Sequence, residues 1–154
     1  MRPGDELPFD PDVEVDATGA QPRARFAPGV IAAVAAGGML GAPARYGILR
    51  AVPVSAGTFP WATFWTNVSG SFVLGVVLVC IVDRFPPSRY ARPFFATGFL
   101  GAYTTFSTFA VDGDLLVRDG HVGIALAYWV MSVVVGLAAA VAGIWATRQL
   151  LRSR

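Results

Sequence analysis

The sequence predicts an all-α membrane protein with four transmembrane helices, and three observations lead to this class. Hydrophobic residues make up 55% of the 154 residues. Charged residues make up only 14%, against about 25% in a typical soluble domain. The charges are also segregated, so that long uncharged stretches separate short charged ones. Each uncharged stretch approaches or exceeds the roughly 20 residues that a helix needs to cross the hydrocarbon layer.

The chain begins with a polar segment and then enters the first predicted span. Residues 1–26 hold six of the ten acidic residues and little hydrophobic periodicity, so we predict a disordered acidic cytoplasmic tail. A four-span domain is expected over residues 27–149, followed by a basic tail over 150–154. Its first span, residues 28–49, is uncharged as far as Arg45.

Prolines and charges delimit the other three spans. The second span is expected over residues 59–82, because Pro86 and Pro87 beyond it prevent a helix from continuing. The third, residues 93–116, starts at Pro93, which suits a first helical turn. The fourth, residues 122–147, follows a loop that contains the single histidine, His121.

The third span contains a segment that is a poor lipid-facing helix. Residues 98–110 combine glycines, adjacent threonines and two phenylalanines. Glycine costs about 1 kcal/mol in a helix interior, and β-branched residues add strain. Irregular backbone survives in a bilayer only where protein buries it or where it lines a water-filled path. We therefore predict a break in the third helix at a functional centre.

The arginine distribution predicts the orientation in the membrane. The chain has no lysine, and eight arginines near the spans fall on the side of the amino terminus. Only Arg50 and Arg118 fall on the opposite side. By the positive-inside rule, both termini are expected to be cytoplasmic in a multi-pass protein of the cell inner (plasma) membrane.

Several function classes lack the residues that they require. The sequence shows no nucleophile paired with a base, no metal-ligand cluster and no phosphate-binding glycine loop, so an enzyme is not predicted. The net charge of +2 belongs to arginine clusters beside the spans, so nucleic acid is not an expected partner. Proton-coupled carriers use buried carboxylates or histidines. Asp112 and Asp114 are instead expected near the interface, at the end of the third span.

The polar groups inside the spans are mostly hydrogen-bond donors. The amide of Asn67 has four hydrogen-bonding sites to satisfy at mid-membrane depth. The spans also contain the hydroxyls of Thr66, Ser69, Ser71, Thr104, Thr105, Ser107, Thr108, Tyr128 and Ser132. For any single Ser or Thr, bonding within its own helix or to a neighbouring helix is the simpler explanation. Together, donors without carboxylates favour an anion over a cation.

Arg45 and a phenylalanine pair add two further candidates. Arg45 has two interpretations of equal weight: it snorkels to the interface beside Tyr46, or it raises the positive potential of a vestibule. Phe106 and Phe109 are three residues apart and share a helical face. Packing is the usual explanation, but their positive ring edges could replace water around a small, hard anion.

Small residues at helical spacing indicate close helix packing. Gly37 and Gly41 lie four residues apart in the first span, and Ser71 and Gly75 in the second. Because four spans enclose little interior, we expect these faces to meet in an oligomer.

Three motifs resemble the small fluoride channel family, called Fluc or CrcB. Residues 37–46 (GGMLGAPARY) resemble its pattern G-G-x-x-G-A-x-x-R-Y. Residues 59–75 (FPWATFWTNVSGSFVLG) resemble F-P-x-G-T-x-x-x-N-x-x-G-S-F-x-x-G. Residues 98–109 (GFLGAYTTFSTF) resemble G-F-x-G-G-x-T-T-F-S-T-F, which is highly specific. The resemblance covers about residues 30–147, with every span in register.

The resemblance implies an antiparallel dimer with two fluoride pores along the subunit interface. It implies that Asn67 is a pore-lining donor, that Phe106 and Phe109 form an aromatic box, and that Tyr128 and Ser132 belong to a polar track. The hydroxyls of Thr105 and Ser107 and the side chain of Arg45 are further pore candidates. A structural Na⁺ at the dimer centre is implied, held by backbone carbonyls of Gly101 and Thr104 from both subunits.

The chain departs from the family pattern in residues and in charge. Ala62 and Ala102 replace glycines, and Gly136 stands where the polar track often has a hydroxyl. A chain with a strong arginine bias inserts one way and cannot form an antiparallel dimer with itself. We therefore hypothesise a heterodimer with a reverse-oriented Fluc-type subunit, and a homodimer stays an alternative.

The predicted function is passive efflux of cytoplasmic fluoride through a selective channel without proton or ATP coupling. One alternative is a small dual-topology proton-coupled exporter, which requires a buried glutamate that the spans lack. Another is a non-transporting membrane assembly subunit, which does not account for Asn67 together with residues 104–109.

Overall fold

The computed structural model describes residues 28–53, 55–81 and 88–152. These residues form helices and short connections with no strand among them, which confirms the predicted all-α class. The predicted acidic tail, residues 1–26, lies outside the described residues, and so does the loop that contains Pro86 and Pro87.

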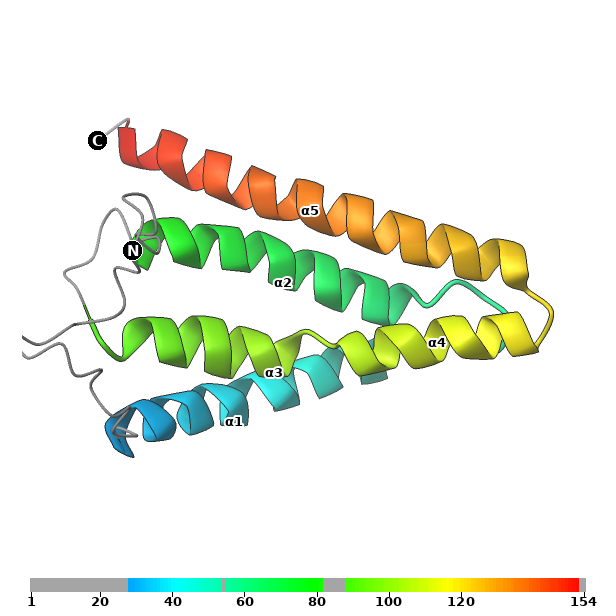
Figure 1. Ribbon diagram of the computed structural model, residues 1–154, viewed down its shortest axis with the longest axis horizontal. Helices are drawn as coiled ribbons and strands as arrows, with labels where there is room; N and C mark the ends of the chain where they lie inside the picture. The colour runs from blue at the N-terminus through cyan, green and yellow to red at the C-terminus, as the bar shows by residue number, and fades with distance from the viewer. Residues whose placement is uncertain (1–27, 54, 82–87, 153–154) are drawn as a thin grey trace, which may run out of the picture.

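The helices lie side by side and alternate in direction along the molecule (Figure 1). The elements are α1 (Pro28–Ala51), α2 (Trp61–Val79), η2 (Pro93–Leu100), α3 (Gly101–Tyr103), α4 (Phe106–Arg118) and α5 (Val122–Arg152). The beginnings of α1 and η2 and the ends of α2 and α5 share one end of the molecule. The connection from α4 to α5 lies at the opposite end.

Three of the four predicted spans are long and apolar enough to cross a membrane, namely Trp61–Val79, Pro93–Arg118 and Val122–Arg152. The predicted first span is helical over 24 residues as α1. It is less apolar than the others because it contains five glycines, two prolines and two arginines. Its length alone therefore supports the prediction. The fourth helix is longer than expected, since α5 continues to Arg152 and absorbs most of the predicted basic tail.

The third span contains two residues with extended backbone. Thr104, with φ −76° and ψ 158°, and Thr105, with φ −144° and ψ 122°, separate α3 from α4. The chain straightens at this point, halfway along the span (Figure 1). The preceding segment, η2, is wound as a π-helix over eight residues. Such π-helical segments are rare and are often found at functional sites.

Backbones approach closely where glycines face a neighbouring helix. A Cβ on Gly75 of α2 would collide with the carbonyl of Ala140 in α5, and one on Gly41 of α1 with the carbonyl of Phe99 in η2. Accordingly, α2 packs along α5 and α1 packs along η2. Gly41 and Gly75 therefore serve packing within one chain. The expectation that these motifs also mark an oligomer contact stays a prediction, and so does the dimer itself.

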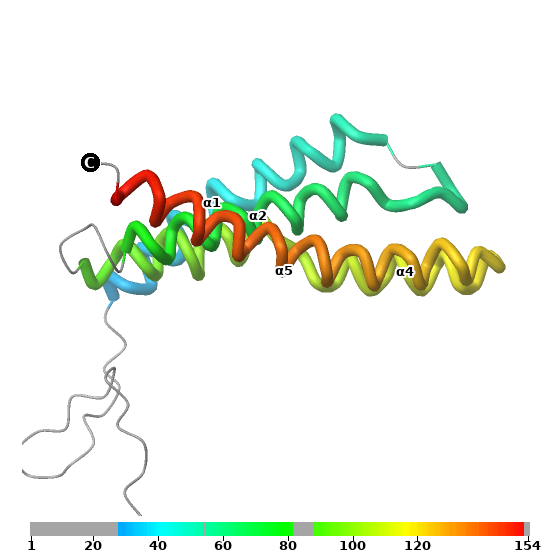
Figure 2. The backbone as a smooth tube through the Cα atoms, turned by 90° about the horizontal axis from the view of Figure 1, so that it is seen from above, coloured from blue at the N-terminus to red at the C-terminus, as the bar shows by residue number. Residues whose placement is uncertain are grey.

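α1 diverges from the plane of α4 and α5 towards its C-terminal end (Figure 2). A buried cluster of Phe64, Val68 and Tyr128 joins α2 to α5, with Phe59 and Phe109 packed against it. By contrast, many large apolar side chains on α4 and α5 are exposed, among them Val111, Val130, Leu137, Val141 and Trp145. Such faces belong against lipid or another protein.

Candidate functional site

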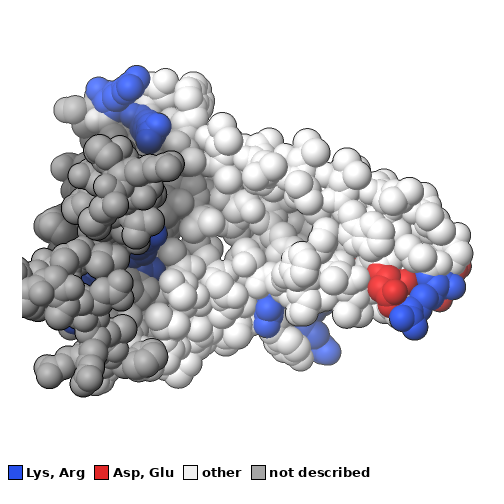
Figure 3. Space-filling view, viewed as in Figure 1, with Lys and Arg blue, Asp and Glu red and all other residues white. Residues whose placement is uncertain are grey.

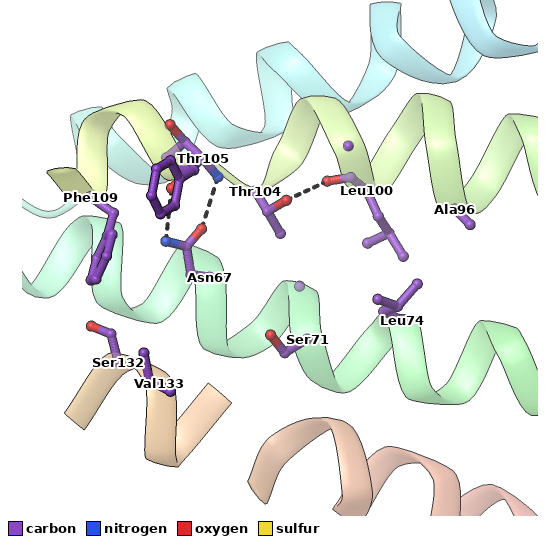
Figure 4. A pocket seen from close by; sticks show the side chains of 13 residues that line it. Asn67, Ser71, Leu74, Ala96, Leu100, Thr104, Thr105, Phe109, Ser132 and Val133 are labelled. Atoms are coloured by element: carbon purple, nitrogen blue, oxygen red, sulfur yellow. Dashed lines mark hydrogen bonds between the residues drawn. The ribbon is translucent and has the colours of Figure 1, made fainter. Parts of the chain in front are cut away.

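The side chain of Asn67 pairs with the backbone of Thr105 at the interruption between α3 and α4 (Figure 4). Asn67 Nδ2 donates to the Thr105 carbonyl at 3.0 Å, and the Thr105 N–H donates to Asn67 Oδ1 at 2.9 Å. Both backbone polar groups of Thr105 are thereby satisfied inside a membrane-spanning segment, where an unpaired group costs several kcal/mol. The Asn67 amide has a second N–H beyond this pair.

The hydroxyl of Thr105 begins α4. Its Oγ1 accepts from the N–H of Thr108 at 3.1 Å, which is the usual capping role of a threonine. The same oxygen lies 3.0 Å from the Thr108 hydroxyl and 3.3 Å from that of Ser107. Two predicted site residues, Thr105 and Ser107, are thus brought together.

These bonds redirect two donors away from the helical ladder. In a continuous helix, the N–H of Thr105 would donate to the carbonyl of Gly101, and that of Thr108 to the carbonyl of Thr104. Here they donate to Asn67 and to the Thr105 hydroxyl. The two carbonyls that the resemblance assigns to Na⁺ are therefore those whose helical donors are engaged elsewhere. Backbone oxygens are suitable ligands for a hard cation.

Arg45 reaches the same interruption from α1. Its Nη1 lies 3.5 Å from the carbonyl oxygen of Thr104, and the side chain is half-buried. Tyr46 is exposed, and its ring faces Arg50 at 6.0 Å instead. Of the two interpretations of Arg45, this geometry favours a cation beside the site over one that extends to the interface with Tyr46.

An open cavity of about 410 Å³ lies between α2, the third span and α5. The sequence-predicted residues that line it are Asn67, Gly101, Thr104, Thr105, Phe106, Phe109 and Ser132. Its wall is polar beside Asn67 and Thr105 and becomes apolar towards Leu74 and Ala96 (Figure 4). Within the described part of the chain, no carboxylate lines this cavity and no cluster of three His, Cys, Asp or Glu could hold a metal ion.

Three predicted site residues do not line the cavity: Arg45, Ser107 and Tyr128. Tyr128 is fully buried behind Phe109, with ring centroids 5.2 Å apart. The buried hydroxyls of Tyr128 and Ser132 have no hydrogen-bond partner that meets normal geometry within the described part of the chain. Ser132 lines the cavity, and its hydroxyl still has an unused hydrogen-bond donor.

The two phenylalanines differ in environment. Their ring centroids are 5.9 Å apart, with planes tilted by 42°. Phe109 packs against the buried cluster, whereas Phe106 is 79% exposed. Because the exposed Phe106 ring lines the cavity, this side of the cavity is not covered by the rest of the chain.

Sequence reasoning missed one polar contact next to the site. Thr63 Oγ1 donates to Asp112 Oδ2 at 2.7 Å, and Thr63 is buried. The signal was in the spacing, since Thr63 lies four residues before Asn67 and Asp112 three after Phe109. Each pair shares a helical face. Thr66, by contrast, donates to the Ala62 carbonyl of its own helix, as the simpler explanation expects.

Fold and site together define a multi-pass helical membrane protein whose interrupted third span faces a cavity that is polar at one end and apolar at the other. A family model described as CrcB-like protein, Camphor Resistance (CrcB), matches residues 32–144. The chain belongs to this family.

Three relatives carry names that state an activity. The Fluoride-specific ion channel FluC 3 of Streptomyces avermitilis is 48% identical over 132 residues, which cover 86% of this chain and 65% of the relative. FluC 2 of the same organism is 54% identical over 99 residues, covering 64% and 63%. FluC 1 of Streptomyces coelicolor is 46% identical over 125 residues, covering 81% of both. The chain thus spans just under two thirds of the two Streptomyces avermitilis relatives.

Proposed function

We propose that this chain is a subunit of a fluoride-selective channel that releases cytoplasmic fluoride passively. The observation that carries the proposal is the Asn67–Thr105 pair, which presents an amide donor at the interruption of the third span. The names of the relatives support fluoride as the ion.

The lining of the cavity suits a small anion that must shed its water. A dehydrated anion needs replacement donors, and Asn67, with a second N–H, and Ser132, with a hydroxyl, both line this space. The positive ring edges of Phe106 and Phe109 add weaker donors. Because no carboxylate among the described residues lines the cavity, none of them places a fixed negative charge there to repel the ion.

A second subunit completes the proposed site. The cavity is open, and Phe106 on its wall is 79% exposed. An antiparallel partner would cover this side and enclose two pores. The arginine bias favours a reverse-oriented Fluc-type partner over a second copy of this chain. Two FluC relatives named in Streptomyces avermitilis agree with paired chains.

A structural Na⁺ fits the interruption. The carbonyls of Gly101 and Thr104 would hold it together with those of the partner, since their helical donors are engaged elsewhere. Bound there, the ion would stabilise the dimer centre. The chain is expected in the cell inner membrane with both termini cytoplasmic, and tags on each terminus, tested for protease access in intact cells, would check this orientation.

Fluoride efflux from liposomes, followed with an ion-selective electrode, tests the proposal. The wild-type chain, alone or with a reverse-biased partner, should release fluoride without chloride once a potassium ionophore dissipates the voltage. Asn67→Asp and Phe106→Ile should abolish efflux, whereas Leu126→Ala, on an exposed position of α5 away from the cavity, should keep it.

Two outcomes would contradict the proposal. Folded protein that releases no fluoride, with or without a partner, would favour a non-transporting assembly subunit. Flux that depends on a pH gradient would favour a proton-coupled exporter instead.

A further inference from the structure

Ser71 is a polar residue of the cavity at Asn67 to which the proposed site gives no role. It lines the cavity from α2, about one helical turn beyond Asn67, and is half-buried. It lies between Asn67 and Leu74, where the lining changes from polar to apolar (Figure 4). No serine or threonine follows it in α2, so Ser71 carries the last hydroxyl of this helix.

The hydroxyl of Ser71 differs from most others in the spans. Four of them donate to the carbonyl oxygen four residues earlier in the same span, namely those of Thr66, Ser69, Thr104 and Thr147. By contrast, no hydrogen bond joins the Ser71 hydroxyl to another described residue (Figure 4). Its O–H is therefore available to a ligand in the cavity.

The helices α2 and α5 run in the same direction and stay in step beside Ser71 (Figure 1). A Cβ on Gly136 of α5 would lie 3.6 Å from Ser71 Oγ. Four residues further along both helices, a Cβ on Gly75 would collide with the carbonyl of Ala140. Each helix advances by about one turn between the two contacts, so the contacts form successive layers. The backbones meet at the layer of Gly75 and Ala140, which closes the space between the helices there.

The layer of Ser71 is open by comparison. Gly136 has no side chain, and the 3.6 Å separation would admit a methyl group in ordinary contact. About one turn earlier on both helices lie Asn67 and Ser132, which line the same cavity. The donors of the cavity thus continue from that layer to Ser71, over one helical pitch of about 5.4 Å.

An ion at Ser71 has only neutral groups around it on these two helices. Neither α2 nor residues 122–147 of α5 include a charged residue. Accordingly, the surface over α2 and α5 is uncharged between the two ends of the molecule (Figure 3). A hydroxyl donor in such surroundings can replace a water molecule in the hydration shell of a small anion.

Given the proposed function, we propose that the Ser71 hydroxyl is a further ligand for the conducted fluoride, on the side of Asn67 towards the end of α2. Because α2 ends at the side of the molecule that is expected to be cytoplasmic, an outgoing ion reaches Ser71 before Asn67 and Ser132. Gly136 leaves room for the ion beside this hydroxyl.

The variant Ser71→Ala tests this role in the liposome efflux assay. It should lower the rate of fluoride efflux several-fold. Its unfolding temperature should equal that of the wild type, because the substitution breaks no hydrogen bond among the described residues. Ser69→Ala is the matched control, since it removes a hydroxyl from the same helix outside the cavity and should keep the wild-type rate.

A second pair of variants moves the hydroxyl to the other helix. Because a Cβ on Gly136 would lie 3.6 Å from Ser71 Oγ, a serine there carries its hydroxyl towards the space that Ser71→Ala empties. Ser71→Ala combined with Gly136→Ser should therefore regain most of the lost efflux. Ser71→Ala combined with Gly136→Ala adds the Cβ without the hydroxyl and should not.

The outcomes separate this ligand from the proposed function. Wild-type fluoride efflux that is unchanged in Ser71→Ala would overturn the role of Ser71 and leave the proposed function standing. A loss that comes with a lower unfolding temperature, or that Gly136→Ser restores no better than Gly136→Ala, would assign Ser71 to packing between α2 and α5 and overturn its role as well. Folded wild-type protein without fluoride efflux would refute both.

Discussion

The hydroxyl of Thr63 donates a 2.7 Å hydrogen bond to the carboxylate of Asp112 and so joins the beginning of α2 to α4. Thr63 is only 2% exposed, and Asp112 is half-buried. The contact lies one helical turn from Asn67 along α2 and about one turn from Phe109 along α4. It therefore holds together the two elements that carry these site residues.

Thr63→Val should destabilise the protein by about 1–3 kcal/mol, because it leaves a partly buried carboxylate without its donor. Asp112→Asn should cost less, since the amide still offers an acceptor to the Thr63 hydroxyl. Thermal unfolding in detergent, followed by circular dichroism, checks the order of the two variants. Equal unfolding temperatures for both variants and the wild type would show that the contact contributes nothing.

Removal of the Thr105 hydroxyl should loosen the start of α4. Thr105→Val deletes the cap on the Thr108 N–H, which costs about 0.5–2 kcal/mol. The pair with Asn67 uses only the backbone of Thr105 and should persist. Fluoride efflux should fall in Thr105→Val because the interruption is held less firmly.

Thr105→Ser is the matched control for this prediction, since serine restores the capping oxygen. It should recover both the unfolding temperature and the efflux. A serine variant as impaired as the valine variant would show that the methyl group, not the cap, matters at this position.

The helices were predictable from the sequence because prolines and charged residues mark where they begin and end. Pro93 starts the third span, and the charges near His121 precede α5. The charge of Arg148 ends the predicted span of residues 122–147 but does not end the helix, because α5 continues to Arg152.

Partners across the bundle were beyond sequence reasoning. Asn67 was recognisable as a buried amide, but its position in the sequence does not reveal that the Thr105 backbone is its hydrogen-bond partner. Likewise, Gly41 and Gly75 indicated close packing without saying whether the neighbour lies in the same chain. Tyr128 carries a hydroxyl in a span, yet its ring is held behind Phe109. These relationships depend on how whole helices are placed.

Gly41→Ala should destabilise the α1–η2 contact by about 1–3 kcal/mol or more, because the added methyl meets the Phe99 backbone. Gly47→Ala is a control on the same helix, since a Cβ there meets nothing within 4 Å. That variant should be neutral, or more stable by up to about 1 kcal/mol from helix propensity. The unfolding temperatures of the two variants test this prediction. A Gly41→Ala variant as stable as the wild type would show that α1 and η2 do not approach closely at Gly41.

Arg45 should act on conduction mainly through its charge. Its 3.5 Å separation from the Thr104 carbonyl makes a weak hydrogen bond, whereas a cation beside the site raises the local concentration of anions. Arg45→Gln should therefore reduce fluoride efflux several-fold, and Arg45→Lys should restore most of it. Inert salt raised from about 0.1 M to about 1 M shortens the screening length from about 10 Å to about 3 Å. The wild type should then approach the rate of Arg45→Gln. If Arg45→Lys is as slow as Arg45→Gln and salt changes neither rate, the guanidinium works by positioning the Thr104 carbonyl, and the electrostatic account is wrong.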